Sequence, residues 1–495
     1  MTRFSLTTLM AALVMTGCTT LAPEYTQPAA PVPAQWPVNI TDTRNAGADA
    51  LASQPAASVP WQDFIVDSQL RDVVALALEN NRDLRIAALN IDRARDLYRV
   101  QRSELFPTID AQGSSTRQRT PASVSPDGNT STSGVYQAGV GASAYELDLF
   151  GRIRSLNEQA LQLYLATEEA RKSVQIALVA EVATAYLTLG ADKERLDLAR
   201  QTLQAQSQSY DLVKRSYELG VATLLDVRQA QTQVETARVD IAQYSSRVLE
   251  AQNLLNLLVG TTVPEALLPH SQMGDRVTLA SLNAGLSSDI LLSRPDVLAA
   301  ERKLQAANAN IGAARAAFFP RITLTASAGT SSSALSDLFD GGTGFWKFIP
   351  SINLPIFDAG RNQANLGVAQ TDQKIAVADY EKAIQTAFSE VADALARRST
   401  LDDQLKAQTA LVEATSEYYS LSEARFNSGI DSYLTVLDAQ RSLYAAQQAL
   451  ISLRLEANSS AVYLYRSLGG GWVSADSSSG LTSESVLADA VRAGS

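Results

Sequence analysis

The 495-residue sequence has a single cysteine, Cys18, and a single histidine, His270. One cysteine excludes a disulfide within the chain, and one cysteine with one histidine is too few for the usual zinc ligand sets. The sequence also has no nucleophile–base pair and no phosphate-binding loop. We therefore expect a protein that is not an enzyme and that uses no metal and no bound cofactor.

Aromatic residues are few, at 6% of the chain, and positive charge is in deficit, with a net charge of −11. Nucleic acids require basic patches, so we expect no nucleic-acid partner. After the N-terminus no stretch reaches the roughly 18 apolar residues that a transmembrane helix needs. The best candidate, residues 176–191, is interrupted by Glu181. A mature chain that crosses a membrane would then do so as a β-barrel.

The N-terminus has the pattern of a processed signal. Arg3 precedes an apolar run over residues 4–15, which ends just before Cys18 in a motif that resembles a bacterial lipobox. This pattern predicts a signal peptide over residues 1–17 and a covalent lipid, such as palmitate, on Cys18. An ordinary secretory signal with a chance cysteine is the alternative. Thr19, rather than Asp, is typical of sorting to the outer membrane.

Residues 18–66 are predicted to form a lipidated, extended segment. Prolines exclude a helix in the first part of this segment. They stand at positions 23, 28, 31, 33 and 37. Residues 40–60 are small and polar, which is typical of a linker or of disorder, and the sequence leaves both open.

The rest of the chain is a tandem repeat with an offset of about 209 residues. Residues 220–231 align with residues 429–440, and both segments begin with glycine and end in Ala-Gln. Each copy has the same predicted order: a helix, two strands, a very long helix, a glycine-marked turn and a second long helix. The predicted parts are a first repeat over 67–261, a linker over 262–288, a second repeat over 289–469 and a tail over 470–495.

Two segments in each repeat alternate between apolar and polar residues, which predicts strands. They are residues 107–118, 135–149, 320–332 and 345–357. Each is long enough to cross a bilayer when tilted. Four strands cannot close a barrel, for which about eight is the practical minimum. A soluble four-stranded sheet is the alternative, but the signal peptide and lipid favour a barrel that several chains share.

The remaining segments predict long coiled-coil hairpins over residues 153–260 and 361–468. Residues 153–219 contain no proline and one glycine, and residues 362–428 share this property. A continuous helix of this length spans about 100 Å, which is typical of coiled coils. Apolar residues recur at every seventh position, as a coiled coil requires. The two first helices of the repeats are predicted over residues 69–105 and 289–318.

Several segments are specific enough to indicate a family. They are residues 77–85, 145–152, 294–296, 311–320, 380–385 and 437–442. The chain resembles the outer membrane factor (TolC-like) family, and most closely its OprM-type lipoprotein channels from tripartite multidrug efflux pumps of the RND type. The resemblance implies a mixed α and β fold in a homotrimer. Four strands per chain would form a shared 12-stranded β-barrel, which a 12-helix α-barrel and a mixed equatorial domain would continue into the periplasm. The segment over residues 18–66, the linker and the tail would contribute to the equatorial domain.

The resemblance also implies two functional sites. A periplasmic gate would be formed by Leu434, Asp438 and Arg441. From the residues alone, an exposed Asp438–Arg441 pair on one helix is the simpler interpretation. The tips of the two hairpins would dock a periplasmic adaptor. They comprise Gly220, Val221, Ala222, Gly429, Ile430 and Asp431. Both tip glycines would also serve as helix caps.

The function implied by the resemblance is a passive exit duct for antibiotics, solvents and other toxic small molecules. Its partners would be a periplasmic adaptor, an inner-membrane RND transporter and outer membrane lipid. The expected location is the outer membrane, with a lipid anchor, a spanning barrel and a periplasmic helical tunnel. A duct for metal efflux or type I protein secretion is the alternative, and a coiled-coil lipoprotein without transport activity is a third possibility.

Overall fold

The computed structural model describes residues 20–37, 59–270 and 287–472. The signal peptide and Cys18 lie outside the described residues, as do most of the predicted linker and tail. The chain forms two compact units. Unit 1 consists of Met1–Ala29, Asn90–Glu168 and Ala299–Glu381, and unit 2 consists of Ala30–Leu89, Glu169–Leu298 and Lys382–Ser495. Neither unit coincides with a sequence repeat, because each repeat contributes chain to both.

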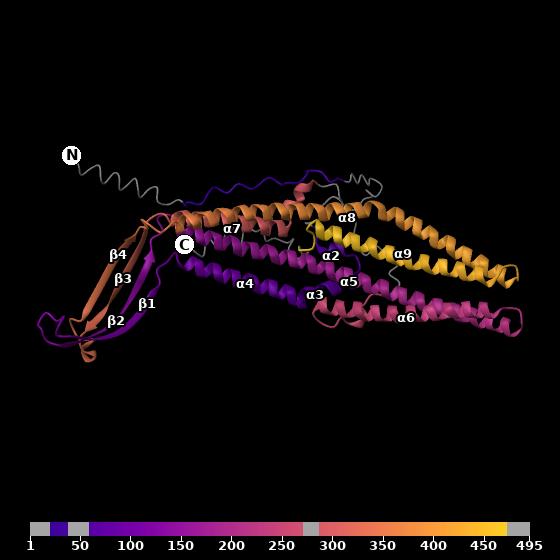
Figure 1. The fold of residues 1–495 in the computed structure, drawn as a ribbon, viewed down its shortest axis with the longest axis horizontal. Helices are drawn as coiled ribbons and strands as arrows, with labels where there is room; N and C mark the ends of the chain where they lie inside the picture. The colour runs from indigo at the N-terminus through magenta and orange to yellow at the C-terminus, as the bar shows by residue number, and fades with distance from the viewer. Residues whose placement is uncertain (1–19, 38–58, 271–286, 473–495) are drawn as a thin grey trace. The chain divides into compact units, whose positions relative to one another are not determined.

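Unit 1 contains one antiparallel sheet with the strand order β1-β2-β3-β4 (Figure 1). The strands are β1 (Ile109–Thr120), β2 (Ser131–Glu146), β3 (Arg321–Ser332) and β4 (Gly344–Asn353). All four predicted strands are thus present, with ends shifted by a few residues. The sheet order leaves β1 and β4 as edge strands.

Small residues bring the two central strands close together. Gly139 of β2 pairs with Gly329 of β3. A Cβ atom added at Gly139 would lie 2.6 Å from the carbonyl oxygen of Ala328, so no larger residue fits without movement. One face of the same sheet carries exposed apolar side chains, including Trp346 at 80% and Ile352 at 69% exposure. An apolar, exposed face of this kind on a four-stranded sheet indicates contact with lipid or with another protein.

Two helical hairpins supply most of unit 2. They comprise α5 (Arg152–Glu218) with α6 (Leu224–Val259), and α8 (Arg361–Asn427) with α9 (Tyr433–Ser467). Both ends of α8 follow those of α5 by 209 residues, which is the predicted repeat offset. Each long helix runs without a break, as the scarcity of proline and glycine predicts.

The predicted single helix over residues 69–105 is wrong, because Asn81 divides it into α3 (Ser68–Asn80) and α4 (Arg82–Ser103). The Asn81 backbone is extended, and its side-chain oxygen accepts a hydrogen bond from the amide of Leu84 at 2.8 Å. Its amide group donates to the carbonyl of Leu258 in α6 at 2.7 Å. A contact with a residue so distant in sequence decides this break.

The predicted helix over residues 289–318 is also divided. A 3-10 helix, η5 (Ser288–Ser293), precedes α7 (Pro295–Ala316). Proline is favoured at the first position of a helix because a backbone N–H there would have no partner within the helix. The residue before a proline avoids helical geometry, which separates η5 from α7. The short elements α2 (Trp61–Phe64), η4 (Glu265–Leu267) and η6 (Leu335–Asp337) complete the described secondary structure.

Most heptad positions are buried or half-buried in the hairpins, although Tyr217 near the first tip is 43% exposed. Val182, Leu189 and Leu255 are fully buried, and Val227 and Leu464 are buried as well. Helix α5 contains an 18-residue window that is long and apolar enough to cross a membrane by composition, with a mean hydropathy of 1.5. Of that window 72% is buried, so its apolar character is explained by packing inside the protein.

Candidate functional site

The two hairpin tips have the same backbone turn. Gly220 and Gly429 adopt positive φ angles of 76° and 73°, which glycine reaches without a steric penalty. The residue after each glycine donates its amide to a carbonyl five residues back, at 2.9 Å in both tips. This is the Schellman arrangement that ends a helix. It leaves Val221 at 83% and Ile430 at 63% exposure, so both tips present an apolar side chain.

The next helices begin differently in the two tips. In the first, Thr223 and Asp226 form a capping box with hydrogen bonds of 3.2 and 2.8 Å. In the second, Ser432 makes no side-chain cap. Instead Arg425 donates two hydrogen bonds to Asp431, at 2.6 and 3.0 Å. These bonds hold the pKa of Asp431 below its usual range. The Asp431 side chain is therefore bound to the end of α8, whereas the side chains of Val221 and Ile430 are exposed.

The two tips pack against each other through one apolar cluster. From the first hairpin it contains Val213, Val227 and Ala230, and from the second Tyr433, Val436 and Leu437. Tyr210, Ala222, Tyr419 and Phe426 pack around them. Ala222, a predicted docking residue, is thus partly used for internal packing.

The predicted gate residues lie on the face of α9 that points away from this cluster. Leu434 is 58% exposed, and Asp438 and Arg441 are exposed as well. Among the described residues, no ion pair joins Asp438 to Arg441. The simpler interpretation of a paired aspartate and arginine is therefore not realised in this structure.

Asp438 and Arg441 line a polar groove of about 400 Å³ between α5, α6 and α9. In this groove the hydroxyl of Tyr444 donates to Asp240 at 2.9 Å, which links α9 to α6. The side-chain oxygen of Gln206 is buried there without a hydrogen-bond partner. Sequence reasoning did not select Asp240, Tyr444 or Gln206. No sequence pattern marks these three residues, because the sequence does not show which helices meet.

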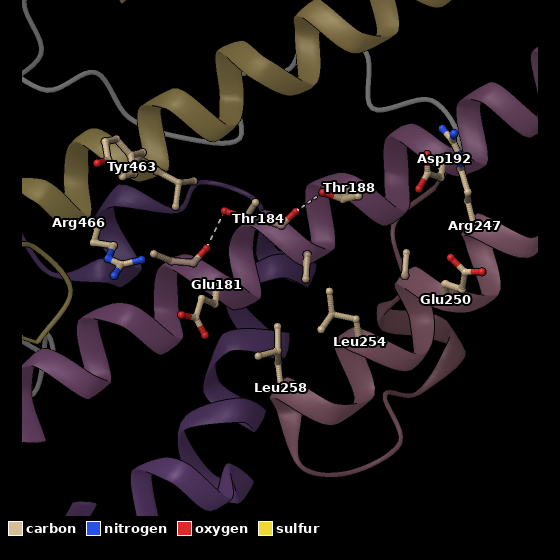
Figure 2. A pocket seen from close by; sticks show the side chains of 14 residues that line it. Glu181, Thr184, Thr188, Asp192, Arg247, Glu250, Leu254, Leu258, Tyr463 and Arg466 are labelled. Carbon is tan, nitrogen blue, oxygen red and sulfur yellow. Dashed lines mark hydrogen bonds between the residues drawn. The ribbon is translucent and has the colours of Figure 1, made fainter. Parts of the chain in front are cut away.

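A second pocket of about 630 Å³ is lined by the same three helices (Figure 2). Its wall on α5 includes Thr184 and Thr188, whose hydroxyls each donate to the carbonyl four residues back at 2.8 Å. Figure 2 shows Leu254 and Leu258 of α6 on the opposite wall. The residues around this pocket were not predicted as a site.

A model of the outer membrane efflux protein family matches residues 73–261 and 286–470, which is more than half of the chain. The chain belongs to the outer membrane efflux protein family. It is 51% identical to the antibiotic efflux pump outer membrane protein ArpC and to the toluene efflux pump outer membrane protein TtgC, both of Pseudomonas putida. Each alignment covers 95% of this chain and 96% of the relative.

Solved structures agree with this family. The open state of the outer membrane channel MtrE of Neisseria gonorrhoeae matches with a TM-score of 0.81 and 38% identity. The match covers 92% of this chain and 99% of that one. The predicted family, mixed α and β fold and outer membrane location are thereby confirmed. This efflux protein is the outer membrane channel component of an efflux pump, as predicted, and its family consists of channel proteins rather than enzymes.

Proposed function

We propose that this chain is the passive exit duct of a tripartite RND-type pump for antibiotics, solvents and other toxic small molecules. The names of the two Pseudomonas relatives, an antibiotic pump and a toluene pump, support this range of cargo. A periplasmic adaptor and an inner-membrane RND transporter are the proposed partners. The sequence similarity extends along nearly the whole chain, which supports a shared architecture as well as a shared cargo class.

The proposed duct is a homotrimer with one shared 12-stranded β-barrel. The four-stranded sheet supports this assembly, because β1 and β4 are edge strands with unpaired backbone groups. Backbone groups within a bilayer need partners, and about eight strands are required before a sheet closes. Three copies would pair each β1 with the β4 of the next copy and remove every edge.

The gate is proposed because Leu434 and Asp438 are exposed on the side of α9 opposite the apolar cluster that joins the two tips, which we call the tip cluster. Three-fold symmetry would bring three Asp438 carboxylates around one axis, where like charges repel unless cations or arginines offset them. Arg441, on the same face, supplies such a charge. Three Leu434 side chains would add an apolar constriction.

The hairpin tips are the proposed docking surface for the adaptor. Val221 and Ile430 are apolar and exposed at the two turns, so they can be buried by a partner. Gly220 and Gly429 shape the turns, and Asp431 is held by Arg425. We further propose that a lipid on Cys18 anchors the chain to the outer membrane.

The segment that follows Cys18 supports this anchor, because it is fixed to unit 1. The carbonyl of Leu21 accepts a hydrogen bond from Arg315 at 3.0 Å, and that of Pro23 accepts one from Asn308 at 2.8 Å. The hydroxyl of Tyr25 donates to Glu301 at 3.1 Å. A lipid attached just before this segment would therefore be held close to α7.

The test of this function is ion conductance in planar bilayers. We expect the purified protein to form channels, and Asp438→Ala, alone and with Leu434→Ala, to raise their conductance because charge repulsion and the apolar constriction are removed. Asp402→Ala, at an exposed position on α8, is the matched control and should leave conductance unchanged. If the two gate variants conduct like the original protein, the gate does not lie at these residues.

A further inference from the structure

The two cavities described above lie along one face of the same three helices. On α6, Gln233 and Asp240 of the polar groove are followed at steps of seven by Arg247 and Leu254 of the larger pocket. A step of seven returns to the same side of a coiled-coil helix. The groove and the pocket therefore share one row of α6.

The other two helices show the same relation. On α5, Thr188 of the pocket precedes Thr202 of the groove by two heptads, with Arg195 between them. On α9, Asp438 of the groove precedes Arg466 of the pocket by four heptads, and Ser452 lies between them. Arg195 donates a hydrogen bond to the hydroxyl of Ser452 at 2.9 Å. This bridge separates the two cavities along one continuous face.

The larger pocket has an apolar floor and acidic groups. Its apolar lining includes Ala185, Ala251, Leu254, Leu258 and Val462. Three carboxylates and two guanidinium groups also line it, so the lining carries one net negative charge. Figure 2 shows the Glu181 carboxylate between the wall of α5 and Leu258. Glu181 takes part in none of the ion pairs among the described residues, and Glu250 accepts a hydrogen bond only from Ser246, at 2.9 Å.

Two of the remaining charged groups of the pocket, Asp192 and Arg247, have partners in the structure. Arg195 holds Asp192 at 2.7 Å, and Arg247 lies over the ring of Tyr244 at 5.6 Å. Arg466 stands at the end of the pocket formed by α9. The volume of about 630 Å³ and the mainly apolar lining with a few polar groups are typical of small-molecule sites.

We propose that this pocket is a binding site inside the duct for an apolar organic cation, held transiently as it is exported. The proposal rests on the proposed function, because the shared face places the pocket in the duct only if Asp438 faces the pore. The apolar floor would contact the body of the ligand, and Glu181 and Glu250 would face its positive charge. A cationic, apolar molecule is thus preferred over an anionic molecule of similar size.

The test measures binding of ethidium, an apolar fluorescent cation, to the protein in lipid nanodiscs, with 8-anilinonaphthalene-1-sulfonate as the anionic comparison. Leu254→Trp fills the pocket and should weaken ethidium binding by roughly tenfold or more. Glu181→Gln keeps the shape, removes one charge and should weaken it by about two- to fivefold. Leu257→Trp, at 74% exposure outside the pocket, and Glu413→Gln, on α8, are matched controls.

The proposal holds if ethidium binds, both pocket variants weaken binding and both controls do not. It is overturned if ethidium does not bind, or if the anionic dye binds equally well and Leu254→Trp weakens its binding too. It is also overturned if the pocket variants bind ethidium as tightly as their controls do. That last result is expected if a second copy of the chain covers the pocket. Channel conductance is measured on the same samples. Normal conductance without dye binding refutes only the pocket, whereas absent conductance refutes the duct itself.

Discussion

At the scale of single residues, Arg294 shows how a buried charge is held in unit 2. It is 7% exposed and donates hydrogen bonds to Asp296 at 2.6 and 3.0 Å and to Glu390 at 2.8 Å. It also donates to the carbonyl of Ser467, at the end of α9, at 2.5 Å. Burial by itself raises the pKa of Asp296, but the hydrogen bonds and charge of Arg294 outweigh this effect and hold the pKa below its usual range. One guanidinium thus joins α7, α8 and α9.

Replacing Arg294 should therefore cost much more than losing a surface pair. In Arg294→Met, Glu390 stays partly buried without its cation, whereas Asp296 is largely exposed to water. Because solvent screens the charges that are left behind, we expect a cost of about 1–3 kcal/mol, below the roughly 3–5 kcal/mol for a fully buried pair broken from one side. We expect a lower midpoint of thermal unfolding, measured by the circular dichroism signal of the helices. Lys406→Met removes an exposed pair with Asp403 and should change stability by less than about 0.5 kcal/mol. Equal effects of the two variants would contradict this role for Arg294.

At the scale of elements, the long helices were predictable because their determinants are local. Absence of proline, scarcity of glycine and a seven-residue apolar period act within each segment, and α5 and α8 begin and end as expected. The break at Asn81 was not predictable, because it depends on a hydrogen bond to Leu258 in another helix. The pocket was missed for the same reason, since the sequence does not show that α5, α6 and α9 share one face.

The gate and tip residues were placed by their resemblance to a family, and the structure adds their surroundings. It separates Leu434 and Asp438, which are exposed, from Tyr433, Val436 and Leu437, which are buried in the tip cluster. A helical repeat predicts such a division in principle. Which side is buried depends on the second hairpin, so a single helix cannot reveal it.

The tip cluster should weaken at alkaline pH. Burial raises the pKa of Tyr433 to about 12, above the usual 10. The folded state therefore resists loss of this proton, and the stability that the neutral hydroxyl contributes is complete below pH 10 and is lost as the pH rises towards 12. We expect the unfolding midpoint of the original protein to fall more steeply over this range than that of Tyr433→Phe, by an amount equivalent to about 1–2 kcal/mol.

Tyr418→Phe is the matched control for this comparison, because Tyr418 is 43% exposed on α8. Its unfolding midpoint should follow the pH dependence of the original protein. Identical pH profiles for Tyr433→Phe and the original protein would show that ionisation of Tyr433 does not affect the cluster. The comparison isolates one hydroxyl, since other buried tyrosines titrate in all three proteins.

At the scale of the whole molecule, the sheet of one chain has an exposed apolar face and two edges without a partner strand. Its exposed apolar side chains, among them Ile109, Trp346, Phe348 and Ile352, lie on one face according to the strand registers. Its edges, β1 and β4, have no partner strand within the sheet. A face suited to lipid and two open edges are compatible in a bilayer only if other copies complete the ring.

Closure can be tested by cross-linking the two edges. Ala111→Cys on β1 is combined in turn with Trp346→Cys, Phe348→Cys or Ile352→Cys on β4, all on the same face of the sheet. At least one double variant should oxidise to covalent dimers and trimers on a non-reducing gel, because the β1 of one copy would lie beside the β4 of the next. Ala111→Cys alone should give no such ladder.

Ala138→Cys with Thr330→Cys provides the control for geometry, since these positions are partners on the central strands of one chain. This pair should form a disulfide within the chain and leave the protein at the mass of one copy. The largest covalent species on the gel shows how many copies form the closed ring. Head-to-tail contacts that close after three copies end at the trimer, whereas contacts that do not close continue to higher species. A ladder beyond three, or none at all, would exclude the shared barrel.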